Sequence, residues 1–175
     1  MGFVFGGSVT RRILSSLAAL AVAVLPVSEA WSACYSPTEA TAVHMRMLQS
    51  ELMVAALACR DSNPELAMIT KYNAFVNRHS TGLVSQNRVL ERHFDRNYGP
   101  QGKRRMDTLL TALANDASKR SMTSDFCGGA ASLFGMISVM EWPQLLRFAG
   151  ERANGSTEAI ASCAATGVRE GMVTR

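Results

Sequence analysis

Helix-start signals recur along this chain of 175 residues, whereas segments that alternate between apolar and polar residues, as strands do, are nearly absent. Residues 36–39 read Ser-Pro-Thr-Glu, a capping box with proline at the first helical position. This box predicts a helix that ends near Arg60. Residues 62–65, Ser-Asn-Pro-Glu, repeat the device and predict the start of a second helix. Together these signals favour an all-α fold.

Apolar spacing extends the helical prediction to the rest of the chain. Thr81-Gly82 is expected to interrupt the second helix, and residues 83–98 carry an apolar stripe that predicts a third helix, ended by Gly99-Pro100. The stretch 124–141 is apolar almost all round, so we expect that helix at the centre of the fold. Further helices are predicted at 103–121 and 142–150. The prediction is one compact helical bundle of about five to six helices.

Residues 1–30 have the pattern of an export signal. Two arginines precede an apolar run at 13–25, a proline ends that run, and Ser-Glu-Ala at 28–30 has small residues at the −3 and −1 positions of a cleavage site. The apolar run is too short to span a hydrocarbon core of ~30 Å as a helix. We therefore predict a periplasmic or secreted protein of the bacterial envelope, with 31–175 as a single mature domain that lacks a transmembrane segment.

Two variants of this signal remain open. Arg11-Arg12 with its flanking residues resembles a twin-arginine signal, which would imply export in the folded state. Residues 31–34, Trp-Ser-Ala-Cys, resemble a lipobox, in which Cys34 would carry a lipid anchor.

The four cysteines of the mature chain are an even number in an oxidising compartment, and this favours disulfide bonds. The absence of CxxC and CxxCH motifs excludes a thioredoxin-type site, a zinc ribbon and covalent c-type haem. Three pairings are possible. We favour Cys59 with Cys127 inside the core, and Cys34 with Cys163 joining the two ends of the mature chain.

A histidine and a carboxylate share the apolar face of the first predicted helix. His44 and Glu51 are seven residues apart and therefore point in nearly the same direction. Because a buried, unpaired carboxylate is costly, Glu51 must be neutral, paired or lining a cavity. One interpretation is an acid–base pair, or two metal ligands with a third donor such as His79 or His93. The other is a structural polar network, with Arg120 as the expected partner of Glu51.

Asn73 and Asn87 lie in otherwise apolar stripes and are further candidates for the same buried network. Sequence motifs of common catalytic and nucleotide sites are absent: the chain has no HExxH, GxSxG, P-loop or GxGxxG. We therefore assign no catalytic residue, metal or cofactor from the sequence.

Basic residues gather at the end of the third predicted helix and just beyond the turn that follows it. They form what we call the basic patch: Arg88, Arg92, Arg96, Lys103, Arg104 and Arg105. Such a patch suits anionic lipid head groups or an acidic envelope polymer. The alternative is a solvated face that Glu91 and Asp95 partly neutralise. The net charge of +4, without exposed aromatic platforms, argues against nucleic acid as the partner.

The expected function is a non-enzymatic binding or structural role in the cell envelope, with an envelope protein or an anionic envelope component as partner. Two alternatives stay open at this point. One is an enzyme or metal-binding protein that uses His44 and Glu51. The other is a peripheral protein that binds anionic surfaces through the basic patch.

Overall fold

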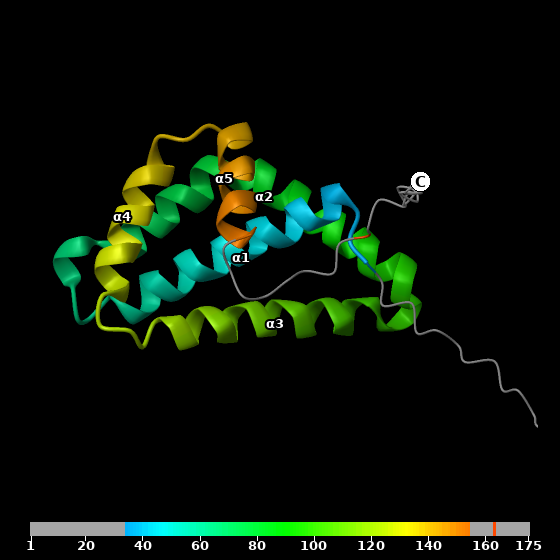
Figure 1. The fold of residues 1–175 in the computed structure, drawn as a ribbon, viewed down its shortest axis with the longest axis horizontal. Coiled ribbons are helices and arrows are strands. Elements are labelled where there is room, and N and C mark those ends of the chain that lie inside the picture. Colours follow the sequence, from blue (N-terminus) through cyan, green and yellow to red (C-terminus); the bar gives the residue numbers. More distant parts are fainter. Residues whose placement is uncertain (1–33, 155–162, 164–175) are drawn as a thin grey trace, which may run out of the picture. The chain divides into compact units, whose positions relative to one another are not determined.

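The computed structural model describes residues 34–154 and Cys163. This part of the chain folds into α-helices joined by short connections, without a β-strand (Figure 1). The all-α prediction is therefore confirmed. In chain order the helices are α1 (Pro37–Ala58), α2 (Met68–Tyr98), α3 (Gly102–Arg120), α4 (Phe126–Ser138) and α5 (Trp142–Asn154), with 3₁₀ turns η1 (Pro64–Leu66) and η2 (Gly99–Gln101) on either side of α2.

The predicted export signal, residues 1–30, and the domain boundary that follows it lie outside the described residues. Among the helices that the structure describes, none combines the length and the apolar character needed to cross a membrane.

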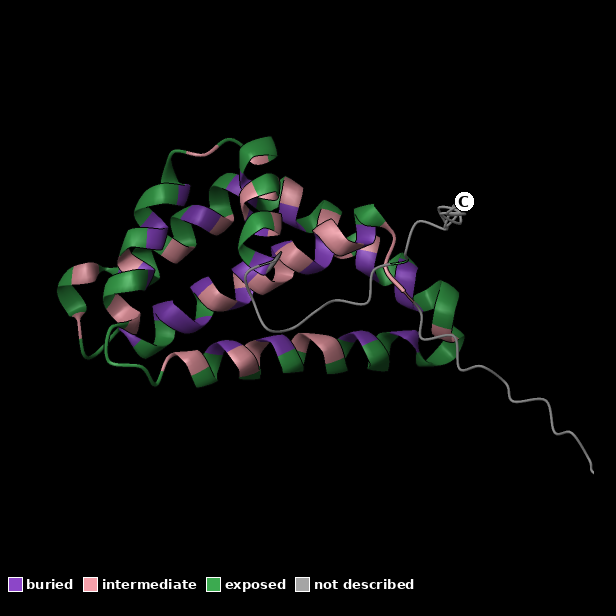
Figure 2. Cartoon of the chain, viewed as in Figure 1, coloured by how far each residue is buried: buried purple, intermediate pink, exposed green. Residues whose placement is uncertain are grey.

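Helix α1 is the central element, because it packs against each of the other four helices. Figure 1 shows it running between α3 on one side and α5 on the other. Its start agrees with the sequence: the Ser36 hydroxyl accepts from the Glu39 backbone N–H, and the Glu39 carboxylate accepts from the Ser36 N–H. Buried positions recur along nearly its whole length (Figure 2).

The expectation that the segment at 124–141 is central is wrong. Helix α4 in that segment packs only against α1 and α2 to any extent, and Met136 and Val139 remain 48% and 77% exposed. The physical reason lies in residue size. Three glycines and two alanines among the thirteen residues of α4 count as non-polar in the pattern, but they offer little apolar area to bury. The larger side chains of α1 offer more.

Helix α2 differs from the sequence prediction in two ways. It starts at Met68 rather than at the second capping box, because Ala67 adopts a left-handed conformation (φ 48°, ψ 41°) that separates it from η1. It also continues through Gly82, where two helices were expected. The only break in helical dihedrals is a kink at His79 (φ −107°, ψ 15°). Gly82 provides space for the ring of Trp142 instead of ending a helix.

The buried apolar residues form two clusters. The larger one lies where α1, the first half of α2, α4 and α5 meet. The smaller one joins the first half of α1 to the end of α2 and the start of α3, and consists of Ala42, Val43, Leu90, Phe94 and Met106. The smaller cluster supports the polar site described below.

Two disulfides link segments that are far apart in the sequence. Cys59, just after α1, is bonded to Cys127 at the start of α4, with 5.7 Å between the Cα atoms. Cys34 is bonded to Cys163, with 4.8 Å between the Cα atoms. These are the two pairs expected from the sequence. The second bond also conflicts with a lipid anchor at Cys34, because the disulfide and the lipid would use the same sulfur atom.

Candidate functional site

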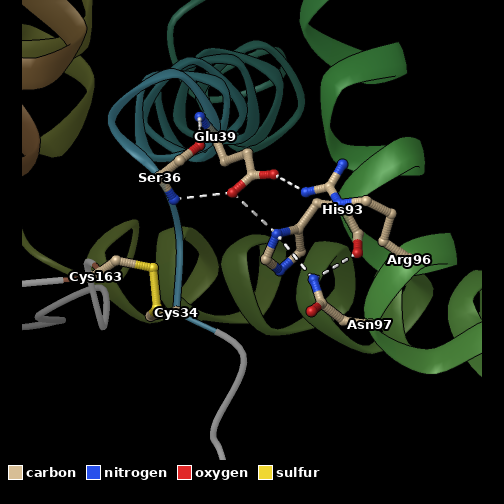
Figure 3. Close-up of a disulfide and its surroundings, with 7 residues drawn as sticks. All are labelled: Cys34, Ser36, Glu39, His93, Arg96, Asn97 and Cys163. Carbon is tan, nitrogen blue, oxygen red and sulfur yellow. Dashed lines mark hydrogen bonds and ion pairs between the residues drawn. A yellow bond between two sulfur atoms is a disulfide. The ribbon is translucent and has the colours of Figure 1, made fainter.

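The most enclosed polar cluster of the described residues joins the start of α1 to the end of α2 (Figure 3). Its centre is Glu39, which is 7% exposed. One carboxylate oxygen accepts from the Ser36 backbone N–H at 2.8 Å and lies 3.2 Å from Nδ1 of His93. The other oxygen pairs with the guanidinium of Arg96. Both oxygens of this buried carboxylate therefore have partners.

The ring of His93 is enclosed by neighbouring side chains of this cluster. Its ring, 1% exposed, stacks on Tyr35 with 4.4 Å between centroids and meets the edge of Phe94. The Asn97 side chain donates to the His93 carbonyl at 2.7 Å. Nδ1 faces the Glu39 carboxylate, which assigns a proton to that nitrogen. Nε2 is buried without a hydrogen-bond partner.

The electrostatics keep Glu39 ionised. Burial alone would raise the pKa of this carboxyl. Hydrogen bonds from the Ser36 backbone, Arg96, the Ser36 side chain and His93 outweigh burial and lower the pKa to about 2. The cluster lies beside the Cys34–Cys163 disulfide, and the Cys163 backbone N–H donates to the Tyr35 carbonyl at 3.0 Å. This arrangement fastens the start of α1 to α2.

The sequence motifs did not predict this cluster, although the sequence contains a signal for it. From the sequence, Glu39 belongs to a capping box and Arg96 to the basic patch, and neither motif indicates the other. His93 lies three residues after Leu90 and beside Phe94, and therefore belongs to the apolar stripe of α2. A histidine on that stripe, one turn from an arginine, points to a buried polar contact.

Glu51 is paired, but not with the expected residue. Arg152 of α5 binds it in bidentate fashion, with Nε to Oε2 at 2.9 Å and Nη2 to Oε1 at 2.5 Å. The first choice, Arg120, pairs instead with Asp116 one turn earlier on α3. The Glu51 side chain is 13% exposed against 10% for Glu39, so Glu39 is the more deeply buried carboxylate.

His44 does not join Glu51. It is half-buried on α1, its Nδ1 lies close to Gly150 of α5, and no hydrogen bond links it to Glu51. Burial lowers the pKa of His44, so the imidazole is neutral at pH 7. The suggested third donors are elsewhere: His79 packs against Phe75 and Trp142, and His93 belongs to the Glu39 cluster. No group of three or more metal-ligating side chains occurs within the described part of the chain.

The two asparagines have separate surroundings. Asn73 is exposed, and so the expectation that it joins a buried network is wrong. The buried face of α2 follows Phe75, His79 and Leu83, and Asn73 points away from it. Asn87 is half-buried, and its side chain donates to Glu91 at 2.7 Å.

All six members of the basic patch are exposed, as expected for a charged surface. Two of them have internal partners: Arg96 binds Glu39, and the Arg105 guanidinium lies 5.5 Å above the ring of Tyr98. The remaining four form no ion pair within residues 34–154: Arg88, Arg92, Lys103 and Arg104.

A cavity of about 240 Å³ lies between the kinked part of α2 and α4. Its walls are mainly aromatic and aliphatic, and His79 lines it. Burial lowers the pKa of His79, Arg78 lowers it further, and Glu141 partly opposes them. Neither His44 nor Glu51 lines this cavity.

Chemically, the two inward-facing carboxylates of α1 hold helices together. Glu39 ties α1 to α2, and Glu51 ties α1 to α5. Each accepts charge-assisted hydrogen bonds from an arginine, so neither is free to act as a general base without breaking a tertiary contact. A comparison of the chain with protein-family models, curated proteins and solved structures gives no match.

Proposed function

We propose that this chain is an exported, disulfide-braced helical protein with a non-enzymatic binding or structural role in the cell envelope. The observation that carries the proposal is how the carboxylates on the inward face of α1 are bonded. Glu39 and Glu51, the residues best placed for acid–base chemistry, are both bonded to arginines of other helices. A group committed to such a contact serves the fold.

The disulfides support the export part of the proposal. All cysteines of the described residues are oxidised, and the two bonds connect positions 129 and 68 residues apart. Such bonds persist in the periplasm and outside the cell, where thiols are not kept reduced. The signal pattern at 1–30 is an independent indication of export.

The test is to express the full chain in a bacterial host, separate the periplasm from the cytoplasm, and measure intact mass with and without reductant. The expected product is periplasmic, starts at Trp31, and gains the mass of four hydrogens on reduction of two disulfides. A control replaces the apolar run at 13–25 by polar residues and should stay in the cytoplasm. A chain that remains cytoplasmic, with Arg11 and Arg12 still attached, would contradict the proposal.

A second candidate function has its own observation: the four unpaired cations of the basic patch. They favour peripheral binding to anionic surfaces. The test is cosedimentation with vesicles of phosphatidylglycerol and of phosphatidylcholine at low and high salt. Arg92→Gln/Arg104→Gln should weaken binding to the anionic vesicles, whereas Lys119→Gln, an exposed cation at the other end of α3, should not. Equal binding to both lipids would exclude this role.

A further inference from the structure

A groove of about 350 Å³ lies between α1 and α2, on the side of α2 that runs from Val76 to Glu91. Its apolar wall comes from Val76, Leu83 and Val84. Val84 is 50% exposed, so this wall is open to solvent at one edge. The volume falls at the lower end of the range of small-molecule sites.

Arg46 enters this groove from α1 and lacks an acidic partner. Its Nη1 donates to the neutral side chain of Gln49 at 2.8 Å. Its Nε is buried without an acceptor. No carboxylate of the described residues forms an ion pair with it. Burial lowers the pKa of this guanidinium, with Tyr72 opposing, but arginine remains charged at neutral pH.

This situation is unusual for the molecule. The other partly buried or inward-reaching arginines, Arg96, Arg120 and Arg152, each have a carboxylate. A half-buried charge without a counter-charge costs folding free energy, and a binding site is a common reason for a protein to keep one.

The opposite wall of the groove adds a second cation. Arg88 of α2 lines the same groove, is exposed and forms no ion pair within residues 34–154. Glu91 also lines it, held by the Asn87 side chain at 2.7 Å. Two guanidinium groups and one carboxylate leave a single positive charge, which matches a monoanion better than a phosphate dianion.

We propose that this groove binds a small organic monoanion, a carboxylate attached to a short apolar body. Arg46 and Arg88 hold the carboxylate, since a guanidinium presents paired donors that match its two oxygens. The apolar body lies against Val76, Leu83 and Val84. The inference rests on the non-enzymatic binding role proposed above and adds a ligand class to it.

The experiment uses octanoate as the probe and the oxidised chain starting at Trp31. Isothermal titration should detect octanoate binding, with octanol and octylammonium much weaker. Arg46→Gln should weaken octanoate binding at least about tenfold, the effect of losing a charge-assisted hydrogen bond. Arg88→Gln should weaken it less, because that side chain is exposed. Arg147→Gln is the matched control, an exposed arginine of α5 that lies outside both the groove and the basic patch, and should bind like the wild type.

Folding and binding are separated by melting each variant without ligand. Arg46→Gln should melt at or above the wild-type temperature, because it removes a charge without a partner. Arg46→Lys keeps the charge but loses the paired donors, and should bind with intermediate affinity. Octanol binding as tightly as octanoate, or an Arg46→Gln chain with wild-type affinity, would overturn the proposal. Either result leaves the export and disulfide measurements unchanged, so the two proposals can fail separately.

Discussion

The ring of Trp142 lies against the bare α-carbon of Gly82: a Cβ at Gly82 would be only 2.4 Å from Cε2 of the indole. The first residue of α5 thus packs into α2 at a position where only glycine leaves room. Three residues earlier the ring of His79, at the kink of α2, also meets Trp142, with 5.8 Å between centroids. This contact explains why a glycine occurs within a continuous helix.

Gly82→Ala should destabilise the fold. Overpacking against the rigid indole costs about 1–3 kcal/mol, whereas the better helix propensity of alanine returns at most about 1 kcal/mol. Urea unfolding measures the difference. Gly129→Ala in α4 is the control, since nothing lies within 4 Å of a Cβ there, and it should be neutral or stabilising. If both variants unfolded at the same urea concentration, the Trp142 contact would be wrong.

Acid should weaken the fold through Glu39. The pKa of Glu39 is about 2 in the folded chain, against 4.5 for an unperturbed glutamate, so the folded state binds the proton less well. The resulting stabilisation is present above about pH 4.5 and is lost as the pH falls towards 2, amounting to roughly 3 kcal/mol. Unfolding free energies measured from pH 6 to pH 2.5 test this.

Two variants make the acid measurement specific. At pH 6 the Glu39→Gln variant should have a lower unfolding free energy than the wild type. At low pH the difference between the two free energies should narrow, because the wild type loses stability there and the variant no longer carries the titrating group. Glu65→Gln, an exposed carboxyl, should follow the wild-type curve. A Glu39→Gln curve parallel to wild type across this range would refute the assignment.

Glu51 should couple energetically to Arg152 and not to Arg120. The Glu51 side chain is 13% exposed but Arg152 is 42% exposed, so solvent screens part of the attraction. A double-mutant cycle with Glu51→Ala and Arg152→Ala should give a coupling of about 1 kcal/mol. The same cycle with Arg120→Ala should give a coupling near zero. A larger coupling of Glu51 to Arg120 than to Arg152 would instead support the partner expected from the sequence.

Removing the Cys59–Cys127 bond should cost more stability than removing Cys34–Cys163. The second bond closes the longer loop, 129 against 68 residues, yet a doubling of loop length adds only about 0.6 kcal/mol. Cys59 is fully buried in the larger apolar cluster, whereas Cys163 is exposed. Replacing Cys59 and Cys127 by alanine therefore loses the cross-link and core packing, about 2–5 kcal/mol together.

Melting temperatures of the two double-alanine variants give this comparison directly. Peptide mapping of the wild type without reductant should first recover the two predicted pairs. Equal melting temperatures would show that packing at Cys59 contributes little, and a Cys34–Cys59 peptide would show that the pairing itself is wrong.

Local signals in the sequence were sufficient for much of the fold. The capping box at Ser36 and Glu39 involves groups three residues apart, so its hydrogen bonds depend on the chain alone. The end of α2 at Gly99 has the same local origin, since φ there is 51°. The pairing of Cys59 with Cys127 followed from the even number of cysteines and from the expected position of both residues inside the core.

The sequence places Glu51 on the apolar face of its helix, but it could not name the partner. Helical periodicity determines which residues share a face. It does not determine which other helix covers that face or at what height. Arg152 reaches Glu51 across 101 positions only because α5 packs on α1.

The same limit applies to α4, to Gly82 and to His93. The apolar count of α4 suggested a central helix, but burial depends on the area that its small side chains can offer to neighbours. Gly82 looked like a break because the ring that needs its space lies 60 residues further along the chain. His93 meets Glu39 through contacts that form only when α1 and α2 are packed together. Short-range hydrogen bonds and periodicity are encoded locally, whereas partners and vacant space arise from the tertiary packing.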